Sequence, residues 1–124
     1  MLHQDLTEKI IKAFYTVYNT LGYGFLEKVY ENALIIEFQK IDLHSSQQES
    51  IKVLYDDHIV GDYVADIIVN DVVIIEVKAA EGLREEHRNQ LLNYLKSTDK
   101  EIGLLLNFGK KPEFKRVILT NDKK

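Results

Sequence analysis

The sequence predicts a domain of the α/β or α+β class, built on a mixed β-sheet flanked by helices. Three segments repeat apolar residues at three- and four-residue steps, the pattern of amphipathic helices. Five shorter segments are rich in β-branched and aromatic residues, which is typical of strands. Their order is ααβββαββ, without an internal repeat or a linker, so one domain over residues 1–124 is expected.

The three helices are expected over residues 5–21, about 25–40 and 85–97. Asp5 followed by Glu8 has the spacing of a capping box and is predicted to begin the first helix. Gly22-Tyr23-Gly24 then interrupts the helical pattern. The inner face of the second helix is predicted to consist of Leu26, Val29, Ala33 and Leu34.

The five strands are expected over residues 51–55, 59–69, 72–78, 102–108 and 115–120. Asp56-Asp57-His58 and Asn70-Asp71 are predicted turns, and a loop surrounds Pro112. The third strand is apolar on both faces and is therefore predicted to be central in the sheet.

The composition excludes several classes of protein. Apolar residues make up 45% of the chain and charged residues 29%, which excludes a wholly disordered protein. The absence of cysteine excludes a disulfide scaffold, a cysteine nucleophile and thiolate metal sites, and it suits a reducing cytosol. The N-terminus lacks a secretory signal pattern and the apolar runs are too short to span a bilayer. A soluble cytoplasmic protein is expected.

Charge is distributed unevenly along the chain, whose net charge is −4. Residues 1–75 carry 5 basic and 12 acidic side chains, hence −7, whereas residues 76–124 carry 11 and 8, hence +3. A general basic footprint for nucleic acid is missing. Carboxylates beside a mildly basic half are compatible with a metal-dependent phosphodiesterase.

Two acidic residues stand inside apolar strands and need a partner. In the third strand Glu76 points to the same face as Lys78, and a carboxylate there must be paired or must bind a metal. Asp66 is a similar lone acid in the second strand. A two-residue loop at Asn70-Asp71 would place Asp66 and Glu76 on opposite faces, whereas a three-residue loop or a bulge would pair them directly.

If the two carboxylates meet, they repel each other by about 4 kcal/mol at roughly 4 Å and an effective dielectric near 20. A divalent cation removes this penalty, and hard oxygen ligands favour Mg²⁺ or Mn²⁺. Lys78 could orient the attacking water or stabilise charge that builds on a phosphate. Asp66 followed by Glu76-Val77-Lys78 is the D…ExK arrangement of metal-dependent nucleases. The competing interpretation is a structural Glu76–Lys78 ion pair.

Longer motifs make the chain resemble a known family over roughly residues 6–119. The matching segments, in order, are Gly24-Phe25-Leu26-Glu27-Lys28-Val29-Tyr30, Gly61-Asp62-Tyr63 with Asp66, Glu76-Val77-Lys78, Gln90-Leu91-Leu92-Asn93-Tyr94 and residues 103–109. They resemble the GxxExxY family of the PD-(D/E)XK nuclease superfamily, in its RecB-like branch. The resemblance implies a restriction-endonuclease-like core and cleavage of nucleic acid, with DNA favoured over RNA. Ala65 stands where the superfamily name has proline, whereas the charged residues of the motif are all present.

The resemblance also implies a role for each matching residue. Asp66 and Glu76 would hold Mg²⁺ or Mn²⁺, the Val77 carbonyl would be a further oxygen ligand, and Lys78 would be the catalytic lysine. Glu27 would be another acidic ligand or a water-positioning group. Gln90 and Tyr94 match the QxxxY element that helps to hold DNA and the active site in RecB-like nucleases. An exposed glutamate at Glu27 and solvated edge residues at Gln90 and Tyr94 are the alternatives.

The remaining candidates concern substrate and partners. Arg84 and Arg88 lie one helical turn apart and are predicted to contact phosphate, with a solvated face as the alternative. The four histidines show no metal-ligand spacing, and the tyrosines and phenylalanines form no evident base-stacking platform. A metal-dependent nuclease is the leading hypothesis. A non-catalytic nucleic-acid-binding or assembly module is the alternative, and a homodimer would enlarge its binding surface.

Overall fold

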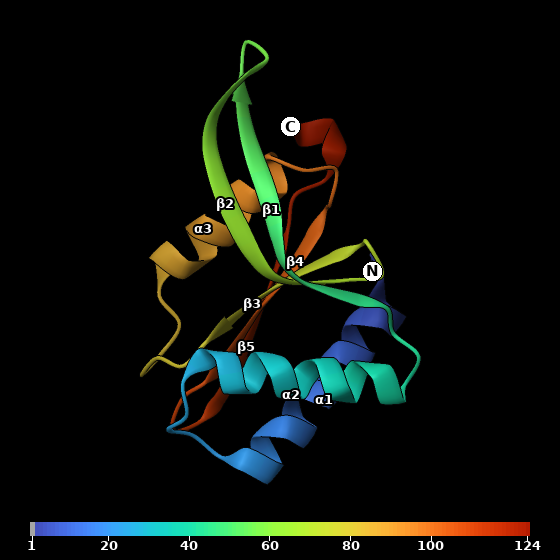
Figure 1. Cartoon of the computed structure of the whole chain (residues 1–124), viewed down its shortest axis with the longest axis vertical. Coiled ribbons are helices and arrows are strands. Elements are labelled where there is room, and N and C mark those ends of the chain that lie inside the picture. Colours follow the sequence, from blue (N-terminus) through green and yellow to red (C-terminus); the bar gives the residue numbers. More distant parts are fainter. Residues whose placement is uncertain (1) are drawn as a thin grey trace.

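The protein, a computed structural model in which residues 2–124 are described, has the element order expected from the sequence (Figure 1). The elements are α1 (Gln4–Leu21), α2 (Glu27–Lys40), β1 (Ser45–Tyr55), β2 (His58–Val69), β3 (Val73–Lys78), α3 (Glu85–Lys96), β4 (Ile102–Phe108), β5 (Pro112–Ile118) and the short 3-10 helix η1 (Asn121–Lys123). Only η1 was not expected. No helix within residues 2–124 has the length and the apolar character that a membrane span needs.

The five strands form one mixed sheet in the order β1-β2-β3-β4-β5. The first three strands are antiparallel neighbours, β4 runs parallel to β3 after the α3 crossover, and β5 pairs antiparallel with β4. The prediction of a mixed sheet with a central third strand is therefore confirmed. Residues 73–77 of β3 are all buried, as its apolar sequence on both faces requires.

Helices cover both faces of the sheet, so the molecule has three layers. Val73, Ile75 and Val77 of β3 pack in one apolar cluster with residues of α1 and α2. Ile74 packs in a second cluster with Leu91 and other residues of α3. The alternation predicted along this strand is confirmed, and Glu76 shares the side of Ile74.

The predicted inner face of α2 is confirmed at Ala33 and Leu34, which pack in the core, but is wrong at Leu26 and Val29. The helix begins at Glu27 rather than Phe25, and Leu26 and Val29 are 82% and 40% exposed. The buried stripe instead consists of Tyr30, Leu34 and Phe38, with the buried Glu31 beside it. The large ring of Tyr30 decides this orientation because it stacks on Phe108 of β4, with centroids 4.1 Å apart and planes 10° apart.

The predicted capping box of α1 is also wrong. The helix begins at Gln4 after His3, whose side chain makes no capping hydrogen bond. Asp5 lies inside the first turn, where its negative charge favours the helix dipole but cannot cap the helix. Glu8 accepts a hydrogen bond from Gln4 Nε2 at 3.0 Å instead of reaching back to the N-cap.

Two strands differ in extent from their predicted ranges. β1 begins at Ser45 rather than Ile51, because the polar residues 45–50 pair with the end of β2 although they lack strand propensity. β5 begins at Pro112, a residue that an edge strand tolerates at its first position. The β1–β2 hairpin turns at Asp56 and Asp57, both with positive φ, and projects from the body of the molecule (Figure 1).

Candidate active site

The connection between β2 and β3 decides which residues face each other. Val69 pairs with Val73, so three residues, Asn70, Asp71 and Val72, form the loop. The first two have φ values of 52° and 57°, a conformation that Asn and Asp tolerate better than other side chains. The structure therefore has the three-residue alternative, and the two-residue loop with the acids on opposite faces is wrong.

At Asp66 and Glu76, hydrogen bonds from side chains to the backbone take the place of the backbone–backbone hydrogen bonds that join β2 and β3. The last regular pair is Ile67 with Ile75, so the next positions are Asp66 and Glu76. Glu76 Oε2 accepts a hydrogen bond from the backbone N–H of Asp66 at 2.8 Å. Asp66 Oδ2 in turn accepts from the backbone N–H of Val77 at 2.7 Å. Each carboxylate is thus held by the backbone of the opposite strand, and the two acids share one point of the sheet.

Burial makes this pair electrostatically unfavourable. Glu76 is only 3% exposed, and burial followed by the charge of Asp66 raises its pKa to about 8. Burial also raises the pKa of Asp66, although the hydrogen bond from Val77 opposes the shift. Within residues 2–124 no ion pair joins Lys78 to Glu76, so the structural-pair interpretation is not the arrangement found. The carboxylates therefore need a proton or a cation.

Lys78 connects this strand to α3. Its Nζ donates to Gln90 Oε1 at 3.2 Å, and Gln90 Nε2 donates to the Tyr94 hydroxyl at 3.1 Å. Burial, followed by the charges of Glu76 and Asp66, raises the pKa of Tyr94 to about 12, so its phenol stays neutral. The four-residue spacing of Gln90 and Tyr94 places both on one helix face. Gln90 thus contacts the lysine, and Tyr94 contacts Gln90.

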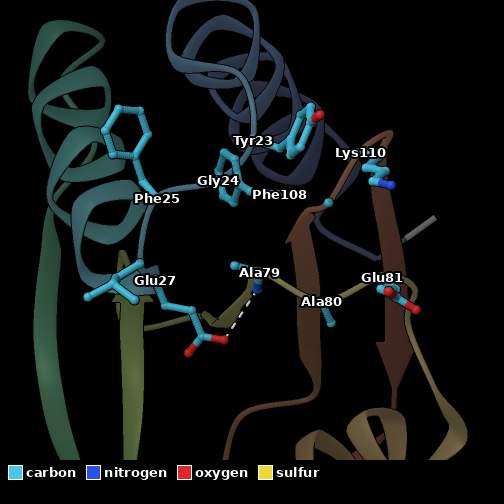
Figure 2. Close-up of a pocket in the computed structure, with 11 residues that line it drawn as sticks. Tyr23, Gly24, Phe25, Glu27, Ala79, Ala80, Glu81, Phe108 and Lys110 are labelled. Atoms are coloured by element: carbon cyan, nitrogen blue, oxygen red, sulfur yellow. Dashed lines mark hydrogen bonds between the residues drawn. The ribbon is translucent and has the colours of Figure 1, made fainter.

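Glu27 approaches the same strand end from the other side of the sheet. It is the first residue of α2, and its Oε2 accepts a hydrogen bond from the backbone N–H of Ala79 at 3.2 Å (Figure 2). Ala79 directly follows Lys78, so Glu27 lies beside the end of the D…ExK segment. Its side chain is exposed, in agreement with either a solvated glutamate or a group that meets an incoming ligand.

Tyr30 anchors the loop that precedes Glu27. Its hydroxyl donates to the carbonyl of Gly22 at 2.8 Å and accepts from the N–H of Phe25 at 3.2 Å. Gly24, between them, has a φ of 112°, which disfavours any residue with a Cβ. The tyrosine is fully buried, so its two hydrogen bonds anchor the loop before Glu27 to the hydrophobic core.

Tyr30→Phe is expected to lower the free energy of unfolding by about 0.5–1.5 kcal/mol, because two part-buried hydrogen bonds to the backbone are lost while the ring packing remains. Chemical denaturation followed by circular dichroism measures this change. Tyr55→Phe, at an exposed position in the hairpin turn, is the matched control and should leave stability unchanged. Equal stability of Tyr30→Phe and the wild type would contradict the anchoring role.

A second carboxylate is buried besides Glu76, and it was missed from the sequence. Glu31 is 3% exposed, and its Oε1 accepts from Gln48 Nε2 at 2.9 Å and from Gln47 Nε2 at 3.3 Å. Lys28 forms an ion pair with its other oxygen at 3.3 Å. The available signal was the position of Glu31, one turn after Glu27 and beside a buried aromatic residue. Its charge contributes to the raised pKa of Asp66.

The two glutamines reach Glu31 because β1 is distorted there. Gln48 has a φ of 54°, and the β1–β2 pairing passes from Gln47–Ile67 to Glu49–Ala65 without it. Its place in the register is opposite Asp66. The distortion brings two consecutive side chains to one acceptor, which regular strand alternation would prevent. Only the pairing of β1 with β2 reveals this feature.

The predicted phosphate contacts stay apart from this network. Arg84 directly precedes α3 and forms an exposed ion pair with Glu86 at 3.6 Å. Arg88 is exposed one turn later. No hydrogen bond within residues 2–124 links either arginine side chain to Lys78 or Gln90. Both are free of the acidic pair and face the solvent.

The donor set fits a small divalent cation that also binds substrate. Within residues 2–124, no group of three His, Cys, Asp or Glu side chains is arranged to hold a metal ion. Mg²⁺ needs only one or two protein carboxylates, since waters and substrate phosphates complete its shell. Asp66 and Glu76 supply two carboxylates, and the carbonyl of Val77 offers a neutral oxygen next to them. These residues therefore fit Mg²⁺ or Mn²⁺.

Comparison with protein families shows which superfamily the chain belongs to. A family profile described as PD-(D/E)XK nuclease superfamily matches residues 4–117, nearly the whole chain. The chain belongs to the PD-(D/E)XK nuclease superfamily. Its α+β architecture, with a five-stranded mixed sheet and helices on both faces, is consistent with the restriction-endonuclease-like fold of this superfamily.

Among solved structures, the PD-(D/E)XK domain is similar in fold to the protein titled "Crystal structure of SSO0001". The TM-score is 0.55 at 16% sequence identity, with 77% of this chain and 51% of that chain covered. The chain therefore spans about half the length of that protein. No curated protein shows significant similarity to the chain.

Proposed function

We propose that this PD-(D/E)XK domain is a metal-dependent nuclease that hydrolyses phosphodiester bonds of nucleic acid, with DNA favoured over RNA. The observation that carries the proposal is the mutual anchoring of Asp66 and Glu76 across two strands. A fold has no structural need for a buried carboxylate, Glu76, beside a half-buried one, Asp66, without a cationic partner. Superfamily membership and the adjacent lysine give the pair a chemical purpose.

The residues divide the chemistry among them. A bound Mg²⁺ or Mn²⁺ would supply an activated water and stabilise negative charge on the phosphate. Asp66, Glu76 and the Val77 carbonyl would hold it. Lys78 would place its positive charge where charge grows on the phosphate oxygens, and Gln90 would orient its Nζ. These roles need no further protein base.

Other residues would complete the site around this centre. Glu27 would position a water or ligand at the end of β3, where it already accepts the N–H of Ala79. Tyr94 would hold Gln90 in place through their hydrogen bond and, because its phenol stays neutral, would add no negative charge to the site. Arg84 and Arg88 would contact phosphates that extend past the N-terminus of α3.

The same residues support a more specific placement within the superfamily. Gly24, Glu27 and Tyr30 act together as the GxxExxY motif, because the glycine shapes the loop that the tyrosine anchors. Gln90 contacts Lys78 and is itself bound to Tyr94, as expected for the QxxxY element. We therefore place the domain in the GxxExxY family and the RecB-like branch, as a single domain over residues 1–124 of a cytoplasmic protein.

One observation favours a second candidate, a non-catalytic nucleic-acid-binding or assembly module of the same fold. The net charge of −4 gives no broad cationic surface for a duplex. Such a module would need a second copy to form a larger binding surface. It would retain the carboxylates without cleaving a substrate.

Digestion of labelled single- and double-stranded DNA and RNA separates these candidates. Cleavage is expected with Mg²⁺ or Mn²⁺, none with chelator, and none with Asp66→Asn, which keeps the size of the side chain but removes its charge. The matched control is Asp62→Asn, a change at an exposed carboxylate paired with Lys52 in the hairpin, and it should cleave at the wild-type rate. Cleavage by Asp66→Asn at that rate would refute the assigned site.

A further inference from the structure

A cavity of about 650 Å³ lies beyond the end of β3 and is lined by neither Asp66 nor Glu76 (Figure 2). Three chain segments form its walls, namely residues 23–27 between α1 and α2, residues 79–81 after β3 and residues 108–110 after β4. We propose that this cavity binds one unstacked base of a single-stranded substrate, next to the cleaved phosphodiester, through stacking on Tyr23 and Phe25. The inference rests on the proposed nuclease function and names the substrate group that lies beside the metal-binding residues.

The position of the cavity links it to the reacting centre. Glu27 lines the cavity and accepts the N–H of Ala79, the residue that follows Lys78. Ala79 and Ala80 continue β3 directly into the cavity wall. A phosphate held by Lys78 and by a cation on Asp66 and Glu76 would therefore place the neighbouring nucleoside at the cavity entrance.

Two exposed aromatic side chains outside the hydrophobic core line the cavity. Tyr23 is 59% exposed and Phe25 is 48% exposed. Figure 2 shows both rings along one edge of the cavity, across from Glu27 and Ala79. Aromatic rings next to a nucleic-acid site bind bases without sequence preference, since every base has a π-face. This pair is the stacking surface that the sequence did not reveal.

The walls are held in place before any ligand binds. Tyr30 fixes the loop that carries Tyr23 and Phe25 through two hydrogen bonds. On the opposite wall the Asn107 amide accepts the N–H of Ala80 at 2.9 Å and donates to its carbonyl at 3.1 Å. Gly109 lies so near that an added Cβ would stand 2.5 Å from the Ala80 carbonyl. A preformed cavity lowers the entropy cost of binding.

The charges in the cavity favour a base over a phosphate. Two carboxylates, Glu27 and Glu81, line it and would repel a phosphate, whereas a base is neutral and carries N–H groups that carboxylates accept. Lys110 is the one basic residue in the lining and is exposed at the rim. A phosphate of the same strand would meet this lysine outside the cavity.

Binding of an oligonucleotide that carries a single 2-aminopurine tests the inference. The probe is a short DNA single strand with the fluorescent base at successive positions, bound in Mg²⁺ by Lys78→Ala protein so that it stays intact. Fluorescence should fall strongly at one position because that base stacks. Adding Tyr23→Ala or Phe25→Ala should remove this local quenching and weaken binding at least tenfold. Tyr55→Ala, at a 70% exposed tyrosine of the hairpin turn, should change neither.

The outcomes separate this inference from the nuclease function. Unchanged quenching in the Tyr23 and Phe25 variants overturns the stacking site, whether or not the wild type cleaves. Local quenching lost in those variants supports the site even if no substrate is cleaved. The absence of any binding by wild-type and Lys78→Ala proteins overturns the site as well. Phe25→Leu, which keeps apolar volume without a π-face, should behave like Phe25→Ala, so a folding defect cannot imitate the result.

Discussion

Lys78→Ala should lower the cleavage rate about 100- to 1,000-fold while the fold and the affinity for divalent metal persist. Removal of one preorganised donor that stabilises transition-state charge typically has an effect of this size. Lys78 is half-buried, follows the two acids in sequence, and is directed by Gln90 at 3.2 Å. Because it forms no ion pair with Glu76 within the described residues, its loss breaks only the hydrogen bond to Gln90 and no ion pair.

Single-turnover cleavage of a labelled substrate by excess protein measures this effect. Lys96→Ala, at an exposed lysine that ends α3, is the matched control and should cleave at the wild-type rate. The cleavage rate of Gln90→Ala should lie between those of Lys78→Ala and the wild type, because this change releases the lysine side chain without removing its charge. Equal rates for Lys78→Ala and the wild type would remove Lys78 from the mechanism, whatever the behaviour of Asp66.

Glu76→Gln is expected to stabilise the metal-free protein at pH 8 by a few kcal/mol, yet to have little effect near pH 5. The pKa of this carboxyl is about 8 in the folded protein and near 4.5 when unfolded. Between these values the unfolded chain releases a proton that the folded protein keeps, so the free energy of unfolding falls as pH rises. A difference of one in pKa between the folded and unfolded states corresponds to about 1.4 kcal/mol of stability. Glutamine stays neutral and can still accept the N–H of Asp66.

Denaturant unfolding between pH 5 and 8.5, with chelator present, measures this difference. The wild type should lose stability over that range, and Glu76→Gln should lose less. Mn²⁺ or Mg²⁺ at pH 8 should then stabilise the wild type but not the variant, because ligand binding to the folded state alone raises stability. Glu85→Gln, at an exposed position of α3, serves as the control. Parallel pH profiles of the wild type and Glu76→Gln would show that Glu76 is not held protonated in the fold.

Local sequence patterns were sufficient to predict the helices and strands and to single out most of the candidate site residues. Periodicity located all three helices and five strands, and the apolar run around Glu76 placed β3 at the centre of the sheet. These features depend on side chains near one another in sequence, where spacing alone decides which face is apolar. Asp66, Glu76 and Lys78 were singled out because charged residues are rare inside such strands.

Tertiary structure decided how those residues meet. The three-residue loop after Val69 set the register, and a difference of one residue would have moved Asp66 to the opposite face. Stacking of Tyr30 on Phe108 turned α2 so that Glu31 became buried and Leu26 exposed. The aromatic cavity likewise joins three segments far apart in the chain. Contacts between distant residues determine these features, and no local pattern of the sequence records them.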